Sequence, residues 1–348
     1  MARSDVLVLG AGPVGCTLAL ALQGSPHRVR LVDPQPTASP GFRPIALSHA
    51  SRLILERVGA WGAFPATPIE SIHVSQSGAF GRTRMDAREA GVPSLGYVTQ
   101  YADLVAALRA RVGIEREPGD APRLTVHAEG RAAQARERRY AQNAVVARVA
   151  AEPASQATAY ERFTSEGPLA LLPLAGEWAV VWSARPERAS ALAAAAPQEF
   201  LGALHSAFGD RAGRFVAVRQ RASAPLALRV RASRVEACEV FIGNAAQTLH
   251  PVAGQGLNLG LRDAWDLAQA LHAAEDPGAP QALARFAAQR RLDAAATIGA
   301  TELLARGFLS DHPLARAARG VALTLLDIAP PARNFFARRM IFGPSALP

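Results

Sequence analysis

Two glycine-rich segments carry the residues whose types and spacing could support chemistry. The first places Gly10, Gly12 and Gly15 in a Gly-x-Gly-x-x-Gly pattern. Glycines at this spacing permit a tight turn, the close approach of a pyrophosphate and close helix–strand packing, and a carboxylate about 20 residues later can bind a ribose 2′-hydroxyl. Asp33 stands at that place. The segment predicts a dinucleotide site, and by itself it does not separate FAD from NAD.

The second segment, residues 240–263, contains another closely spaced pair of glycines. Gly254 and Gly256 are expected to open a helix, directly after a loop that holds His250 and Pro251. The first amides of a helix lack intrahelical partners and carry the positive end of its dipole, and the glycines let a ligand approach the backbone. We therefore expect an electron-rich group of a ligand at this helix start.

The rest of the chain offers few alternatives for catalysis. The sequence holds no metal-ligand cluster, no Gly-x-Ser-x-Gly pattern and no evident cysteine nucleophile, and Cys16 and Cys238 are too far apart to suggest a zinc site or a disulfide framework. We expect no bound metal and a reducing, cytoplasmic setting. A bound cofactor would then have to supply the chemistry.

Regular elements are expected to position both glycine segments. The first should lie in a strand–helix–strand unit, with strands at residues 6–9 and 29–32 and a helix that ends at Leu22. The helix after the second segment, near residues 257–272, has one apolar face that should pack inward. That face is formed by Leu257, Leu261, Ala264, Ala268 and Leu271.

Between the two segments the pattern indicates an antiparallel sheet, because short runs of alternating or apolar residues are separated by turns. The expected strands lie at residues 69–86, 144–149, 159–164, 167–174, 178–182 and 215–218. A single alanine-rich helix is expected at residues 187–208, and further helices near 281–309 and 313–328.

The second segment resembles the second flavin-binding motif of the FAD-dependent aromatic hydroxylases, the class A monooxygenases. That motif reads roughly Gly-Asp-Ala-Ala-His, then Pro, then Gly-Gln-Gly-x-Asn-x-Gly, then Asp. Here Asn244 takes the place of the acidic residue and Gln247 that of the histidine. The variant Gly-Asn-Ala-Ala-Gln-Thr-Leu-His-Pro is similar to the ubiquinone-biosynthesis branch, the 2-octaprenyl-6-methoxyphenol hydroxylases.

The resemblance implies a set of cofactor-binding residues. Arg43 corresponds to an arginine that lies along the flavin, with a solvated loop arginine as the alternative, and Gln100 is either a flavin contact or an ordinary polar residue near a helix start. The flavin would carry the chemistry, with loop residues His250 and Pro251 nearest. The full set is Gly10, Gly12, Gly15, Asp33, Arg43, Gln100, Gly243, Asn244, Pro251, Gly254, Gln255, Gly256, Leu257 and Asn258.

One region departs from the family pattern. Family members place an Ala-Asp-Gly signature beside the cofactor phosphates, whereas residues 113–139 of this chain offer only Glu129 and Gly130 as a degenerate copy. The motif is therefore either lost or remodelled, and activity depends on which alternative holds.

The resemblance also implies the architecture. We expect an α/β protein with a Rossmann-type FAD-binding fold, an inserted antiparallel sheet that forms the substrate layer, and C-terminal helices. The FAD-binding domain would comprise residues 1–68, 96–139 and 236–275, the substrate domain residues 69–95 and 140–235, and the helical region residues 276–348.

The function implied is FAD-dependent hydroxylation of a polyprenylated phenol in ubiquinone biosynthesis. NAD(P)H would be the transient electron donor and O₂ the co-substrate. Two alternatives remain open: a non-catalytic flavin- or prenyl-lipid-binding member of a ubiquinone-assembly complex, and another flavin oxidoreductase such as a prenyl-lipid reductase.

The charge of the chain indicates whether it binds nucleic acid or a membrane. The formal net charge is +9, and all 38 basic residues are arginine, dispersed among few aromatic residues, which argues against a nucleic-acid partner. The tail, residues 330–342, carries Arg333, Arg338 and Arg339 beside aromatic side chains. It is suited either to the surface of the inner membrane or to a packed terminal helix.

Overall fold

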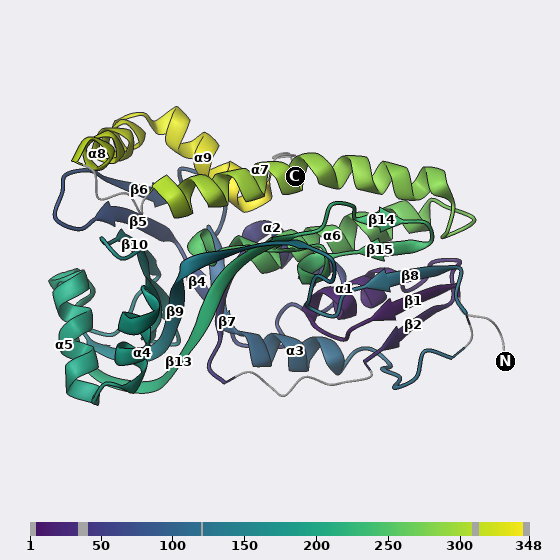
Figure 1. The fold of residues 1–348 in the computed structure, drawn as a ribbon, viewed down its shortest axis with the longest axis horizontal. Coiled ribbons are helices and arrows are strands. Elements are labelled where there is room, and N and C mark those ends of the chain that lie inside the picture. The colour runs from purple at the N-terminus through teal and green to yellow at the C-terminus, as the bar shows by residue number, and fades with distance from the viewer. Residues whose placement is uncertain (1–4, 34–40, 120, 308–312, 344–348) are drawn as a thin grey trace.

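The structure, a computed structural model, describes residues 5–33, 41–119, 121–307 and 313–343. Within these ranges the strands form three sheets, and helices cover them on several sides (Figure 1). The first sheet lies in the half of the molecule that contains the first glycine segment, here called the dinucleotide-type half. The second, larger sheet lies in the other half. A small third sheet consists of β3 (Pro44–Ser48), β7 (Gly96–Gln100) and β4 (Thr67–Ile69).

The first sheet has the order β14-β15-β8-β1-β2. The strands β15, β8, β1 and β2 run parallel, and β14 pairs antiparallel with β15. The predicted strands at 6–9 and 29–32 are confirmed with the same bounds. The strands are β1 (Val6–Leu9), β2 (Val29–Val32), β8 (Leu124–His127), β14 (Val235–Glu236) and β15 (Glu239–Phe241).

Three helices pack on this sheet or beside it, and a fourth, α2, follows β3. Because parallel strands are buried on both faces, they read as continuous apolar runs, and Val6, Val8 and Val126 are fully buried. The helices are α1 (Pro13–Ala21), α2 (His49–Arg57), α3 (Tyr101–Arg109) and α6 (Gln255–His272).

The two glycine segments meet where α1 packs on α6. A Cβ atom on Gly260 would come within 2.8 Å of a Val14 methyl group, and one on Gly243 within 3.0 Å of it. The absence of side chains at these two positions lets the helices approach closely. Because α1 and α6 are in contact here, the starts of both helices lie close to each other and line the same cavity.

The second sheet has the order β16-β13-β9-β12-β11-β10-β5-β6. Its longest strands, β9 and β13, pair antiparallel. They reach from the end of the molecule where α5 (Pro197–Phe208) lies to the dinucleotide-type half (Figure 1). The strands are β5 (Ser71–Gln76), β6 (Arg82–Asp86), β9 (Arg136–Glu152), β10 (Thr158–Phe163), β11 (Pro168–Leu174), β12 (Glu177–Ala184), β13 (Arg214–Val230) and β16 (Gln247–Thr248).

Two predictions in this region were wrong in extent. Residues 187–208 form two helices, α4 (Pro186–Ala194) and α5 (Pro197–Phe208), because Pro197 has no N–H to continue the first helix. The strand predicted at 215–218 is the much longer β13. Much of β13 is polar and exposed, and it is held by backbone pairing with β9 rather than by an apolar face.

The C-terminal helices are α7 (Pro280–Gly307), α8 (Pro313–Ile328) and α9 (Pro330–Phe342). They confirm the predicted helices near 281–309 and 313–328, except that residues 308 and 309 lie outside the described residues. The helix α7 lies along one side of the molecule, and α8 and α9 lie over the β5–β6 end of the second sheet (Figure 1). No helix in the described ranges is long and apolar enough to cross a membrane.

A buried carboxylate joins α6 to its surroundings. Asp263 is fully buried, and it accepts hydrogen bonds from Gly243 N at 3.1 Å, Gln247 Nε2 at 3.0 Å, Arg234 Nη1 at 3.2 Å and Arg290 Nε at 2.8 Å. Burial alone would raise the pKa of Asp263, but the two guanidinium groups outweigh it and hold the pKa below its ordinary value. The carboxylate stays charged and links the glycine loop to α7.

Asp263→Asn is expected to lower the free energy of unfolding by about 3–5 kcal/mol, because it leaves the buried Arg290 guanidinium without one charged partner. Urea unfolding at pH 7 measures the change. Since the folded-state pKa is depressed, the stability that Asp263 contributes is complete above about pH 4 and is lost as pH falls through the folded pKa. Wild type should therefore lose stability more steeply in acid than the variant.

The control for this prediction is Glu152→Gln. Glu152 forms an exposed ion pair with Arg214, with an N–O distance of 2.6 Å, and such pairs contribute at most about 1 kcal/mol. Equal losses for the two variants would contradict a central role for Asp263.

Candidate active site

One large cavity, of about 1950 Å³, lies between the two larger sheets. Its walls are the starts of α1 and α6, the strand β3, one face of the second sheet, and the inner sides of α8 and α9. Sites for a single small ligand usually measure about 300–1,000 Å³. The cavity is thus large enough for a dinucleotide and a second ligand together.

The start of α1 forms one end of the cavity. Gly10 has a φ of +97°, which favours glycine, and a Cβ there would lie 2.7 Å from the Ala128 carbonyl oxygen. Gly12 lines the cavity, and a Cβ on it would meet only the Tyr101 hydroxyl, at 3.6 Å. Gly15 does not line the cavity, because it packs against the Gly10 carbonyl. In the described structure no side chain caps this helix, so its first amides are available to a ligand.

The start of α6 forms a second uncapped helix end on the same cavity. Gly254, its N-cap, has a φ of +60°, and in the part of the chain that is described no side chain bonds its first amides. A Cβ on Gly256 would meet nothing within 4 Å. Both glycines and Leu257 line the cavity. The arrangement fits a flat, electron-rich ligand group held against the backbone.

Asn244 and Gly243 lie in a 3₁₀ turn (Gly243–Ala245) between β15 and the loop. Both line the cavity, and the Gly243 amide is held by Asp263. The Asn244 side chain is half-buried and makes no hydrogen bond to any described residue. Its amide is therefore available to a ligand.

Asn258 has a different environment. Its Oδ1 accepts hydrogen bonds from Ser48 N at 2.9 Å and from Ser51 Oγ at 2.7 Å, and its Nδ2 donates to Ala46 O at 3.0 Å and to Gly254 O at 2.9 Å. These contacts use the full donor and much of the acceptor capacity of the amide. Asn258 thus fixes the start of α6 against β3.

The Gln255 side chain also has an internal contact, since its Nε2 donates to the Met340 carbonyl at 3.3 Å and so joins α6 to α9. Gln100 is the residue before α3 and lies outside the cavity lining. Gln255 was predicted from its place in the second glycine segment and Gln100 from its place at a strand end. Neither signal indicates the direction in which the side chain points.

Asp33 and Arg43 lie at the α1 end of the cavity. Asp33 directly follows β2, as predicted, and its carboxylate accepts a hydrogen bond from Arg109 Nη1 at 2.7 Å. The Arg43 guanidinium lies over the ring of Tyr101, 4.3 Å from its centroid. Burial raises the pKa of Tyr101, so its hydroxyl stays protonated. Arg109 and Tyr101 were not identified from the sequence, because neither belongs to a glycine motif.

His250 and Pro251 lie in the loop before α6 and line the cavity. His250 is buried, which lowers its pKa to about 4, so the ring is neutral near pH 7. Because Val252 N donates to His250 Nδ1 at 3.1 Å, the proton of the neutral ring belongs on Nε2. No described residue accepts a hydrogen bond from that nitrogen. It can donate to a bound ligand.

Glu129 and Gly130, which the sequence offered as a degenerate copy of the missing signature, also line the cavity. A Cβ on Gly10 would lie 2.7 Å from the Glu129 Cα, so this segment runs directly along the first glycine turn. Its position at the end of β8 favours a remodelled motif over a lost one.

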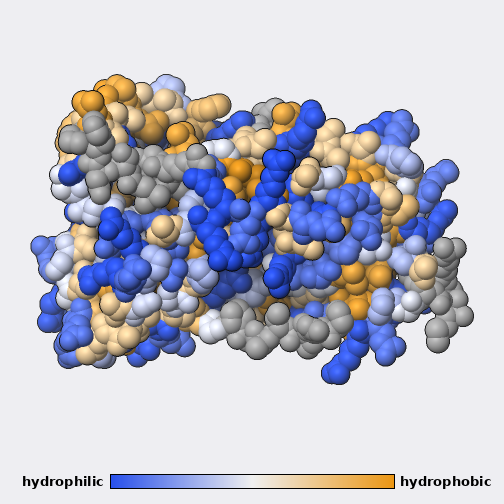
Figure 2. Space-filling model, in the orientation of Figure 1, coloured by the Kyte–Doolittle hydropathy of each residue, from blue (hydrophilic) through white to orange (hydrophobic). Residues whose placement is uncertain are grey.

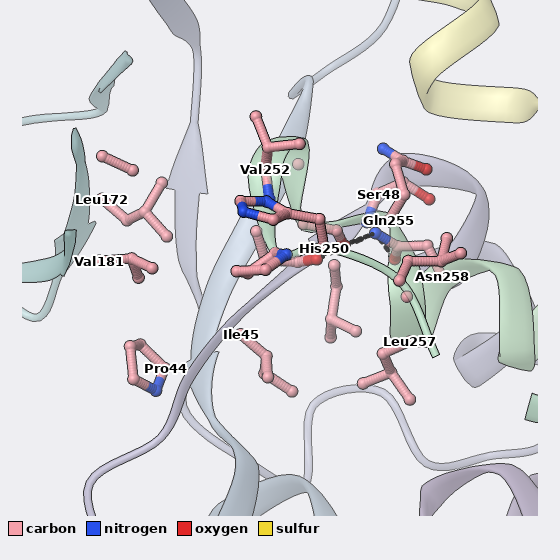
Figure 3. Close-up of a pocket in the computed structure, with 18 of the residues that line it drawn as sticks. Pro44, Ile45, Ser48, Leu172, Val181, His250, Val252, Gln255, Leu257 and Asn258 are labelled. Carbon is pink, nitrogen blue, oxygen red and sulfur yellow. Dashed lines mark hydrogen bonds between the residues drawn. The ribbon is translucent and has the colours of Figure 1, made fainter. Parts of the chain in front are cut away.

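The second sheet supplies the wall opposite the α6 start. Leu172 and Val181 project from it toward the side of the cavity where Ile45 and His250 lie (Figure 3). This wall is mostly apolar, and it also contains Glu161, which the sequence indicated only as part of a strand. A charged residue at an inward position of a strand was the signal that could have identified it.

Comparisons with known proteins agree with this arrangement. A family model described as an FAD binding domain matches residues 108–301. The chain is 31% identical to the ubiquinone hydroxylase UbiL of Rhodospirillum rubrum, over 96% of this chain and 89% of the relative. It is 27% identical to the 3-demethoxyubiquinol 3-hydroxylase of Escherichia coli, over 94% of this chain and 95% of the relative.

Solved structures share the fold. The p-nitrophenol 4-monooxygenase PnpA of Pseudomonas putida is similar with a TM-score of 0.73 and 18% identity, covering 96% of both chains. HpxO of Klebsiella pneumoniae, solved as a complex with FAD, is similar with a TM-score of 0.76 and 14% identity, covering 99% of this chain and all of that one.

The family match spans more than half of the chain, and the resemblance seen in the two glycine segments is confirmed. The chain belongs to the FAD-binding-domain family, as an FAD-dependent aromatic hydroxylase.

Proposed function

We propose that the protein hydroxylates a hydrophobic, prenylated phenol in ubiquinone biosynthesis, using FAD, NAD(P)H and O₂. The names of the relatives from R. rubrum and E. coli support the pathway. The apolar wall of the second sheet supports a hydrophobic substrate. The proposal includes the division of the chain into a cofactor domain, a substrate sheet and a C-terminal helical region with the boundaries expected from the sequence.

The observation that carries the proposal is that two uncapped helix starts open on one cavity. We place the FAD pyrophosphate at the α1 start, where Gly10 and Gly12 leave the backbone bare, and the flavin ring at the α6 start, beside Gly254 and Gly256. The positive end of each helix dipole favours negative charge at these two places. Asp33 is the candidate for the ribose contact.

Bound FAD supplies electron transfer from NAD(P)H and the activation of O₂. The chain contributes binding and positioning. In this proposal Asn244 accepts a hydrogen bond from a hydroxyl of the cofactor chain, and His250 donates from Nε2 to a ligand oxygen. The α6 start would favour negative charge on a ligand group held there, and the apolar sheet would exclude water from the site.

The main test is turnover. Purified protein loaded with FAD should oxidise NAD(P)H faster when a prenylated methoxyphenol is present, and mass spectrometry should detect one oxygen atom from ¹⁸O₂ in the product. The two alternatives give different results. A non-catalytic binding protein would bind the lipid without oxidising NAD(P)H, and a prenyl-lipid reductase would add hydrogen to the lipid without incorporating ¹⁸O.

Gly12→Val is expected to weaken FAD binding at least tenfold while leaving the fold intact. Its side chain would extend into the cavity where we place the pyrophosphate, and the nearest protein atom to a Cβ there is 3.6 Å away. Fluorescence titration of the apoprotein with FAD measures the affinity, and thermal unfolding of the apoprotein measures the fold.

Gly113→Val serves as the control, because Gly113 lies outside the cavity lining and a Cβ there would meet nothing within 4 Å. It should keep normal FAD affinity. Normal affinity in the Gly12 variant as well would show that the pyrophosphate does not bind at α1.

A further part of the proposal concerns the membrane. The tail that the sequence offered as a membrane contact forms α9, in which Arg333 is buried and pairs with Glu89, with an N–O distance of 2.7 Å. That contact favours the packed-helix interpretation for the tail. The tail exposes one large apolar side chain, Phe335, but a larger exposed apolar face lies on α8, where hydrophobic residues gather at one corner of the molecule (Figure 2). It consists of Leu314, Val321, Leu325 and Ile328.

We propose that this α8 face rests on an anionic membrane surface. Exposed Arg82 and Arg84 on the neighbouring strand β6 suit acidic headgroups. The inner side of the same helix lines the cavity through Ala322, Leu323 and Leu326. A substrate tail could therefore pass from the lipid beneath α8 into the site.

The pair Leu325→Gln with Ile328→Gln should weaken vesicle binding about tenfold or more, because each exposed side chain contributes on the order of 1 kcal/mol when it enters the lipid. Sedimentation with phosphatidylglycerol–phosphatidylethanolamine vesicles measures it. Leu292→Gln, at a residue that is 70% exposed on α7, is the matched control and should bind normally. Unchanged binding by the double variant would exclude the α8 face as the contact.

A further inference from the structure

Glu161 is placed in an apolar row of the second sheet. It pairs with Val74 on β5 and with Ala170 on β11, and Ala170 in turn pairs with Val181 on β12. All four side chains line the cavity. Because paired residues on neighbouring strands point to the same face, Glu161 faces the cavity together with Val181, about 10 Å away across two strand spacings.

The Glu161 carboxyl is alone on this wall. No described residue gives it a hydrogen bond or an ion pair. Burial raises the pKa of Glu161 to about 7, and no neighbouring charge contributes to that shift. Glu161 is half-buried and faces an apolar cavity, where a charged carboxyl without a partner is costly to keep unless a ligand interacts with it.

No other charged group near this part of the cavity acts as a partner of the Glu161 carboxyl among the described residues. His73 and Arg162, next to Glu161 in the sheet, point to the opposite face, where His73 contacts Tyr160. His250 lies in the loop before α6 and is neutral near pH 7. The ring of Tyr160, another residue of the lining, also packs on the opposite face, against Trp178 and Phe208. The remaining ionisable residues of the cavity lining are Asp33, Arg43, Tyr101, Asp103, Arg109, Glu129, Arg319 and Arg333.

We propose that Glu161 is the catalytic base that binds the phenolic hydroxyl of the substrate and removes its proton. The proposal rests on the proposed function, because it requires a phenol in the space between the second sheet and the α6 start. The phenol O–H bond breaks, the O–H bond of the Glu161 carboxyl forms, and the electron pair stays on the phenol oxygen. The negative charge on that oxygen makes the ring more reactive toward an electrophilic oxygen.

A pKa close to the working pH is the value that a general base needs, since the group is then largely ionised and still basic enough to take a proton. An exposed glutamate, with a pKa near 4, would be a far weaker base toward a phenol. The apolar side chains around Glu161 therefore give it the raised pKa that this proton transfer requires.

The first experiment compares kcat for a prenylated methoxyphenol between pH 5.5 and 9. Wild-type kcat should rise with pH through an apparent pKa near 7. Glu161→Gln should lose that rise and fall on the order of 10²-fold at pH 8, which is the typical contribution of a general base. Glu161→Asp, which keeps a carboxyl, should recover the rise and part of the rate. The FAD content of both variants should equal that of wild type.

A second experiment does not depend on turnover. A 4-nitrophenol with an alkyl tail, whose ionised form is coloured, is bound to each protein and titrated with base. In wild type the probe and Glu161 share protons, so the colour should develop in two coupled steps, whereas Glu161→Gln should give one step. Glu152→Gln, an exposed carboxyl on the same sheet, is the control and should titrate as wild type.

The outcomes separate the two proposals. Hydroxylation by Glu161→Gln within about threefold of wild type, with an unchanged pH profile, would overturn the role of Glu161 and leave the proposed function standing. Wild-type protein that hydroxylates no prenylated phenol but still titrates the probe in two steps would overturn the function and keep Glu161 as a proton acceptor for phenols. Identical probe titrations of wild type and Glu161→Gln would overturn the proposal for Glu161.

Discussion

The buried carboxylate of Asp263 holds together the parts of the protein that the cofactor site requires. It binds the Gly243 amide, the Gln247 side chain and two arginine side chains, so one charge positions the glycine loop, the start of β16 and α7 at the same time. A buried charge is stable only with such partners. Through the Gly243 amide Asp263 joins the Asn244 turn to α6, and both the turn and the start of α6 line the cavity.

The cavity beside Asp263 and its partners has two different halves. The α1 and α6 starts present bare backbone and positive helix ends, which suit a charged cofactor, and the second sheet presents an apolar wall, which suits a hydrophobic substrate. The two meet where His250 and Val181 approach from opposite sides (Figure 3). Within this division Glu161 is the exception, since it places an ionisable group on the apolar side.

The sequence predicted the elements better than it predicted the directions of side chains. The strand–helix–strand unit around Gly10 and the helix after Gly254 were identified because glycine spacing and apolar periodicity are local signals. Asn258 stays a predicted cofactor residue, but its amide also bonds Ser48 and Ser51, about 200 residues away in the chain, and no local pattern reports such a contact. The strand that carries Glu161 was predicted, and a charge among apolar positions was a local signal, but the apolar neighbours of Glu161 come from strands β5, β11 and β12, which no local pattern reports.

The order of strands in the first sheet has a consequence for how the chain folds. Its strands β1 and β2 lie near the N-terminus and the central strand, β8, follows at residues 124–127, but β15 joins only at residues 239–241, and Arg290 binds Asp263 later still. During synthesis the edge of β8 that pairs with β15 must therefore wait while strands β9 to β13 of the second sheet are made. Such non-local pairing is slow and leaves apolar edges exposed. A ligand that binds only the completed sheet draws the chain toward the folded state by mass action. The supply of FAD in the cell should therefore govern how much of this protein accumulates, as well as how active it is.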